Sequence, residues 1–142
     1  MKFKFIRIPA KPSPAFPNKY STLVPIIPVR LINKAKQDKY IDIRAMIDSG
    51  ADVSIFPMSI ADKIELNIDR RKIQQIRGIE QSIIETYRHE IYLEIGGWKF
   101  DTDACFCSKD ITFPVLGRHG FFNLFEVRFD YEKESIELKP KI

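Results

Sequence analysis

The sequence predicts a closed, all-β, barrel-like domain. Short segments rich in β-branched and aromatic residues recur along its 142 residues, and glycine or polar turns separate them. Only one or two brief stretches show helical spacing. A chain of this length suits one domain, and its composition, 44% hydrophobic and 30% charged, is typical of a globular protein.

The first 19 residues carry four prolines, at positions 9, 12, 14 and 17. Proline removes a backbone donor and favours extended chain, so residues 1–19 are predicted to form a proline-rich N-terminal arm rather than core. The domain itself is predicted over residues 20–142. Its first strand, within residues 23–32, contains Pro25 and Pro28, which indicates an edge strand.

The next elements are a strand, a short helix and a long hairpin. Residues 40–47 begin with alternating side chains and end in an apolar run, as a strand does when it enters the core. Pro57 suits the first turn of a helix, which we expect to end near Asn67. Residues 72–95 form an extended hairpin in this prediction, with its turn close to Gly78.

The last third of the chain is predicted to form further β-strands. Gly96 and Gly97 predict a tight turn into a strand at residues 98–107. Residues 113–116 form a short buried strand in this prediction. Residues 125–129 and 135–139 alternate around a polar turn, which indicates a closing hairpin.

Charge and hydropathy exclude several classes of function. The net charge is +4, but lysines and arginines are interleaved with acidic residues, so we expect no nucleic-acid binding. No apolar run approaches the roughly 20 residues that span a bilayer. The N-terminal sequence lacks the apolar stretch of a signal peptide, and we expect a cytoplasmic protein without membrane contact.

The two cysteines, Cys105 and Cys107, lie on one predicted strand. Two cysteines at this spacing have poor geometry for a disulfide. A structural zinc ion needs about four ligands, and the sequence near the two cysteines does not supply the other two. We therefore expect buried, reduced thiols, no metal site and no cofactor.

The most informative stretch is residues 45–56. Asp48 directly follows an apolar strand, and burying a carboxylate there is costly unless it is hydrogen-bonded, paired or protonated. Ser49 can stiffen the following turn, and Gly50 permits a close approach by other groups. A plain surface turn is the alternative, but apolar residues on both sides argue against it.

Residues 47–51, Ile-Asp-Ser-Gly-Ala, resemble the active-site loop of retropepsin-like aspartic proteases. Residues 115–118, Val-Leu-Gly-Arg, are similar to a second element of that family, which lies beside the loop and opens a short helix. The long hairpin resembles the family's flap. The resemblance spans about residues 23–140, and it implies an acid-protease-type barrel with a flap hairpin.

The resemblance also implies an activity. Peptide hydrolysis in this family uses two carboxylates that share a proton and activate a water molecule. This chain carries one such motif, so the resemblance implies a homodimer in which two copies of Asp48 form the site on a two-fold axis. The expected partners are a second copy and a peptide or protein substrate.

Roles follow by position in the family's motifs. Asp48, Ser49 and Gly50 are the expected catalytic residues, with Ser49 bracing the loop. The expected substrate-binding residues are Ala51, Asp52, Gly78 and Ile79. Gly117 and Arg118 are expected to give structural support, Arg118 by pairing with Asp52 and steadying the dimer contact.

Two questions stay open in the sequence. Isoleucines near the loop and flap, among them Ile55 and Ile84, could line a substrate pocket or belong to the core. The alternative function is that of a dimeric module that binds peptides or protein partners with little catalysis, because one fold can host unrelated functions. The intact Asp-Ser-Gly triplet favours the enzyme.

Overall fold

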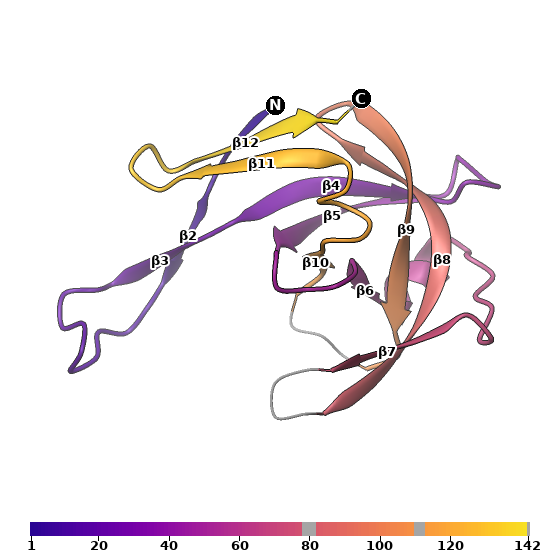
Figure 1. Ribbon diagram of the computed structural model, residues 1–142, viewed down its shortest axis with the longest axis horizontal. Coiled ribbons are helices and arrows are strands. Elements are labelled where there is room, and N and C mark those ends of the chain that lie inside the picture. The colour runs from indigo at the N-terminus through magenta and orange to yellow at the C-terminus, as the bar shows by residue number, and fades with distance from the viewer. Residues whose placement is uncertain (78–81, 110–112, 142) are drawn as a thin grey trace.

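The computed structural model describes residues 1–77, 82–109 and 113–141 (Figure 1). The all-β prediction is confirmed, and one short helix, α1 (Met58–Lys63), accompanies the strands in these ranges. The strands are β1 (Lys2–Lys4), β2 (Ile6–Pro9), β3 (Ser21–Val24), β4 (Ile26–Ile32), β5 (Tyr40–Ile47), β6 (Ile55–Pro57), β7 (Ile73–Arg77), β8 (Ile83–Ile95), β9 (Trp98–Cys107), β10 (Val115–Leu116), β11 (Phe125–Asp130) and β12 (Ser135–Pro140). No helix in the described ranges is long and apolar enough to cross a membrane.

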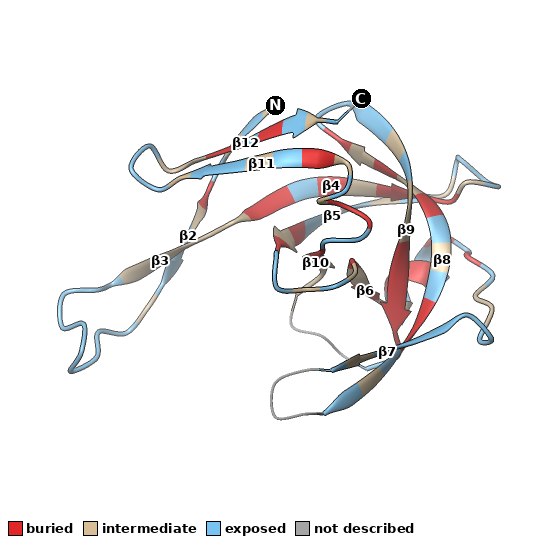
Figure 2. Ribbon diagram, in the orientation of Figure 1, coloured by how far each residue is buried: buried red, intermediate tan, exposed pale blue. Residues whose placement is uncertain are grey.

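The main sheet has the strand order β4-β5-β10-β6-β9-β8-β7. β8 also pairs with β4 at residues 30–32, so the pairings among the described strands return to their start and form a ring. Many of the buried residues belong to strands of this ring, and β4, β8 and β9 carry red segments in Figure 2. Within the ring, β5–β10 and β6–β9 are parallel pairs. The parallel β5–β10 pair places the segments that follow these two strands, from Asp48 and from Gly117, at the same end of the sheet.

The β8–β9 hairpin is the longest pairing in the main sheet, running from Ile95↔Trp98 to Thr86↔Cys107. Gly96 and Gly97 make its turn with φ values of 59° and 83°, a region that glycine enters without steric cost. The predicted tight turn is therefore confirmed. Cys105 and Cys107 are free and buried, as expected.

The strand that contains Pro28, β4, was predicted to be an edge strand, and the structure agrees with this only in part. Pro25 separates β3 from β4, and Pro28 is exposed within β4. β4 pairs with β5 along its whole length and with β8 from Arg30 onward. The edge-strand prediction therefore holds for the first half of β4 and is wrong for the second half, where both sides are paired.

The N-terminal segment contributes more to the core than its prolines suggest. β1 pairs with β12, and β12 pairs with β11, which gives a three-stranded sheet. Phe5 is only 7% exposed, and the Met1 ammonium donates a hydrogen bond to the carbonyl of Leu138 at 2.9 Å. The first five residues thus belong to the folded body, and the β2–β3 hairpin extends from it (Figure 1).

The helical predictions need two corrections. α1 ends at Lys63 rather than near Asn67, because Ile64 leaves helical geometry and Glu65 takes a positive φ of 58°. Residues 119–122, where the resemblance implies a second short helix, form a β-bridge at His119 and turns at 120–122 instead. There the N–H of Phe122 bonds the carbonyl of Gly117, a spacing that an α-helix does not make.

Candidate active site

The loop between β5 and β6 carries Asp48 at the point where β5 leaves the core. The N–H of Asp48 donates to the carbonyl of Leu116 at 2.9 Å, and the N–H of Ile47 donates to the carbonyl of Pro25 at 2.9 Å. The parallel register Leu116↔Ile47 brings β10 alongside. The backbone around Asp48 is therefore fixed from both neighbouring strands.

The Asp48 carboxylate is held by its own loop. Its Oδ1 accepts the backbone N–H of Gly50 at 2.9 Å, and its backbone carbonyl accepts the N–H of Ala51 at 3.2 Å. A Cβ on residue 50 would lie 3.1 Å from that carboxylate oxygen, so glycine leaves room for this contact. Asp48 is half-buried, and Ser49 and Gly50 are exposed. The loop thus presents a positioned carboxylate to the outside of the domain.

Gly117 lies directly against the outgoing half of this loop. A Cβ added to Gly117 would come within 2.3 Å of the Val53 carbonyl oxygen and 2.9 Å of the Ala51 carbonyl oxygen. The N–H of Arg118 donates to the carbonyl of Ala51, and that of His119 to the carbonyl of Asp52, both at 2.9 Å. Only glycine fits at this contact, because both obstructing atoms belong to the backbone.

Ser54 supports the same contact, and sequence reasoning missed it. Its side chain is buried, and its Oγ accepts the N–H of Gly117 at 3.1 Å. Its backbone groups bond His119 and Cys105. The signal in the sequence was a hydroxyl between two apolar residues, Val53 and Ile55, because a buried polar group must find a hydrogen-bond partner.

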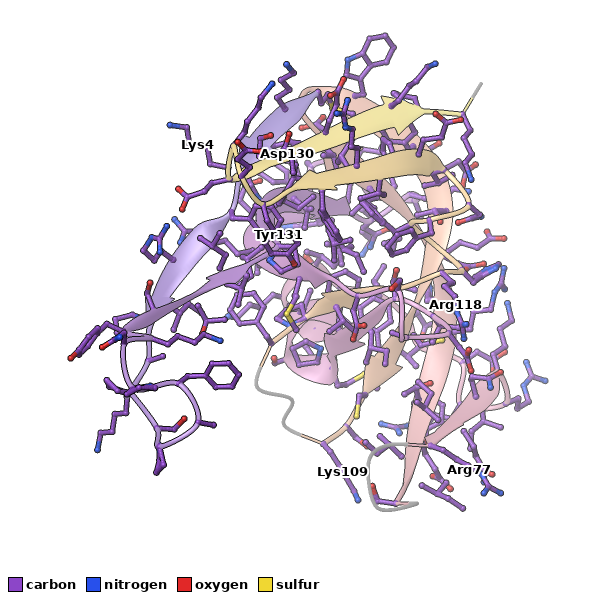
Figure 3. All side chains as sticks on the ribbon, turned by 60° about the vertical axis from the view of Figure 1, so that its left-hand side comes forward. Lys4, Arg77, Lys109, Arg118, Asp130 and Tyr131 are labelled. Atoms are coloured by element: carbon purple, nitrogen blue, oxygen red, sulfur yellow. The ribbon has the colours of Figure 1, made fainter. Side chains whose placement is uncertain are left out.

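Asp52 and Arg118 form the expected ion pair, through Asp52 Oδ1 and Arg118 Nη2. Their side chains are 77% and 57% exposed in the single chain. Figure 3 shows Arg118 on the surface, away from the three-stranded sheet. An exposed pair of this kind contributes little to the stability of the chain that holds it.

A groove of about 540 Å³ opens beside Asp48. The β5–β6 loop and β10 lie on one side of it, and residues of the β7–β8 hairpin lie on the other. The lining residues are Asp48, Gly50, Ala51, Asp52, Ile55, Ile76, Arg77, Ile84, Phe113 and Val115. Ile55 and Ile84 are thus groove residues rather than deep core. Gly78 and Ile79, which were predicted to bind substrate, lie outside the described residues.

A second cavity of about 490 Å³ is lined by Val53, Asp103 and His119, among other residues. Asp103 is central to it, with a side chain only 12% exposed. Its Oδ2 receives Arg88 Nη2 at 2.7 Å and its Oδ1 lies 2.7 Å from His119 Nε2. This network holds the segment that follows Arg118. Sequence reasoning did not find it, because Asp103 and His119 meet only in the folded chain.

The described residues contain no group of three acidic, histidine or cysteine side chains arranged to hold a metal ion. The groove brings together the Asp48 carboxylate, the backbone N–H of Gly50 that donates to it, and apolar walls. Asp52, the other carboxylate of the lining, is paired with Arg118.

Comparison with solved structures identifies the fold. The chain is similar to the retroviral protease-like domain of Ddi1 from Leishmania major, with a TM-score of 0.59 and 17% identity over 82% of this chain and 88% of that one. It is also similar to a retropepsin-like aspartic protease from Rickettsia conorii, with a TM-score of 0.52 and 20% identity over 80% of each chain. No protein-family model matches the sequence, and no curated protein matches it.

The chain therefore has the fold of the retropepsin-like aspartic proteases. The resemblance that residues 47–51 and 115–118 indicated is therefore confirmed at the level of the fold.

Proposed function

We propose that this protein is an aspartic endopeptidase that acts as a homodimer and hydrolyses peptide bonds in extended substrates. One observation carries the proposal. The Asp48 carboxylate is fixed by the N–H of Gly50 at the open end of a buried strand, and it faces a groove bounded by the β7–β8 hairpin. A half-buried carboxylate positioned among apolar groove walls is placed to contact a ligand bound in the groove.

The mechanism requires a second copy of Asp48. Two carboxylates about 3 Å apart share one proton, because both cannot be ionised easily at that separation. The ionised carboxylate takes a proton from water as the water oxygen attacks the peptide carbonyl carbon. The protonated carboxyl donates its proton to the carbonyl oxygen, and proton transfer to the nitrogen then releases the amine. A two-fold axis beside the loop supplies both groups from identical chains.

The groove supports an extended, apolar-flanked substrate. Ile55, Ile76, Ile84, Phe113 and Val115 give it apolar walls. An apolar pocket favours apolar substrate side chains, while an extended peptide can satisfy its backbone groups against neighbouring strands. Ala51 and Gly50 add little bulk near the reacting bond. Ser49, Asp52, Gly78 and Ile79 retain the roles that the resemblance implies for them.

The test compares the wild type with Asp48→Asn on a diverse peptide mixture, read by mass spectrometry from about pH 3.5 to pH 7.5, where a shared-proton pair titrates. Asp38→Asn, an exposed aspartate in the β4–β5 turn, is the matched control. We expect cleavage by the wild type and the control alone. Equal cleavage by Asp48→Asn would reject the assignment, and silence from a confirmed wild-type dimer would favour the peptide-binding module instead.

A further inference from the structure

The β2–β3 hairpin extends from the folded body, and only its base, at Leu23, packs against the core of the described chain (Figure 1). Among the described strands, β2 pairs only with β3 and β3 only with β2. Residues 11–20, which join the two strands, are all exposed, as the blue loop in Figure 2 shows. An isolated two-stranded hairpin is marginally stable in water, so this one gains from packing against something.

Exposed apolar side chains concentrate on this hairpin and on the neighbouring closing hairpin, β11–β12. Five of the nine exposed large hydrophobic residues of the described chain lie there. They are Ile8 (42% exposed), Phe16 (63%), Tyr20 (69%), Phe129 (39%) and Tyr131 (59%). Exposed apolar surface gathered in one region of a domain marks an interaction site.

The two hairpins are joined to each other. The Phe5 ring, at the base of β2, lies 4.7 Å from the ring of Tyr131 and 5.5 Å from that of Phe129, centroid to centroid. Arg7 pairs with Glu134 in the turn of the closing hairpin. Figure 3 shows Tyr131 between the closing hairpin and β2–β3. The pair of hairpins therefore forms one continuous surface.

The loop at the hairpin's end is ordered by its own hydrogen bonds. The N–H of Ala10 bonds the carbonyl of Tyr20 at 2.9 Å, and the N–H of Phe16 bonds Ser13 through both its carbonyl and its hydroxyl at 3.1 Å. Three prolines, at positions 12, 14 and 17, further restrict the chain. A pre-ordered loop loses little entropy on binding, which suits a segment that contacts a partner.

The hairpin begins beside the candidate active site. Pro25, which follows β3, accepts the N–H of Ile47, the residue before Asp48. In Figure 1 the β2–β3 hairpin and the turn of β11–β12 extend to the side toward which the β5–β6 loop opens. Two copies of Asp48 can meet only if the second chain approaches from that side. The second chain would therefore come within reach of both hairpins.

Charge argues against the main alternative occupant, a nucleic acid. Residues 1–24 carry five lysines and arginines and no acidic residue. However, Arg7 is paired with Glu134, and Lys19 lies over the Phe16 ring at 5.7 Å. Few free cations remain near the tip, whereas nucleic-acid binding needs several. The turn at residues 130–134 has three acidic residues and one lysine, so a second copy offers opposite charge.

From these observations we infer that the β2–β3 hairpin is a dimerisation clasp, which packs Phe16 and Tyr20 against a second copy of this chain. The inference rests on the proposed function, because the need for two Asp48 carboxylates is what selects a second copy as the occupant.

The experiment compares the wild type with Phe16→Ser/Tyr20→Ser by sedimentation over a range of protein concentrations. Trp98→Ser is the matched control, an aromatic residue 59% exposed at the β8–β9 turn. We expect the dimer dissociation constant to rise at least about tenfold in the double variant and to stay unchanged in the control, since buried aromatic anchors dominate interfaces. Thermal unfolding of each variant checks that the monomer remains folded.

Three results would overturn the clasp. The first is a wild type that stays monomeric at every protein concentration, and the second is a double variant that dimerises as tightly as the wild type. The third is a double variant that loses the wild type's binding to a labelled single-stranded RNA while its dimer dissociation constant stays unchanged. Peptide cleavage, measured on the same samples, separates this inference from the proposed function. A wild-type dimer that loses association in the double variant but shows no Asp48-dependent cleavage supports the clasp and rejects the protease. Cleavage with an unchanged dissociation constant rejects only the clasp.

Discussion

The backbone N–H of Asp48 donates a hydrogen bond to the carbonyl of Leu116 at 2.9 Å, and this bond ties the candidate catalytic loop to β10. Gly117 follows immediately and lies against the carbonyls of Ala51 and Val53. The position of the carboxylate therefore depends on a second segment, distant in sequence, as much as on its own loop.

Gly117→Ala should destabilise the protein by about 2–3 kcal/mol, because the new methyl group would overlap backbone atoms that cannot rotate away. Gly97→Ala is the control. It has a positive φ of 83° but nothing within 4 Å of an added Cβ, and we expect a loss of about 1 kcal/mol. Urea unfolding measures both. Equal losses would show that β10 moves to accommodate the methyl group.

Ser54→Ala should cost about 1–3 kcal/mol, because it leaves the buried N–H of Gly117 without its acceptor. Ser59→Ala, at an exposed position of α1, should change the free energy of unfolding by less than about 0.5 kcal/mol. The comparison uses the midpoint of chemical unfolding. A Ser54→Ala variant as stable as wild type would mean that the N–H of Gly117 finds another acceptor.

Arg118→Ala should leave the stability of the single chain almost unchanged, because its pair with Asp52 is exposed. We expect the dimer dissociation constant to rise by about tenfold if the second copy covers this pair. Sedimentation measures the constant and thermal unfolding the stability. Arg71→Ala removes another exposed ion pair, with Asp69, and serves as the control. Identical constants for wild type and Arg118→Ala would argue against a role in dimerisation.

Cys105 and Cys107 should not react with a thiol reagent such as dithionitrobenzoate in the native protein near neutral pH. Burial raises the pKa of the Cys105 thiol, so less of it is present as the reactive thiolate than in an exposed cysteine. Both thiols should react once the protein is unfolded. Ser108→Cys places a thiol at the exposed next position and should react at once. Rapid native reaction of wild type would indicate that this end of β9 opens readily.

The sequence determined many of the strands and the candidate loop, because these depend on local patterns. Alternating side chains define β9 and the closing hairpin, two glycines define the β8–β9 turn, and Asp48 stands out as a carboxylate at the end of an apolar strand. These features require only neighbours in the chain, so they can be read without the fold. The pattern also indicated the class of fold that the structural comparison confirmed.

Tertiary structure decided everything that depends on segments meeting across the fold. Phe5 is core because β1 pairs with β12, and the second half of β4 is interior because β8 reaches it. Ser54 matters because Gly117 lies against it, and Asp103 because His119 approaches it. No local pattern encodes such contacts, since each depends on how segments distant in the sequence pair and pack. The ring places Leu116 beside Asp48, and the hydrogen bond from the Asp48 N–H to the Leu116 carbonyl fixes the backbone there. A turn sequence that is common in proteins thereby holds its carboxylate at a groove.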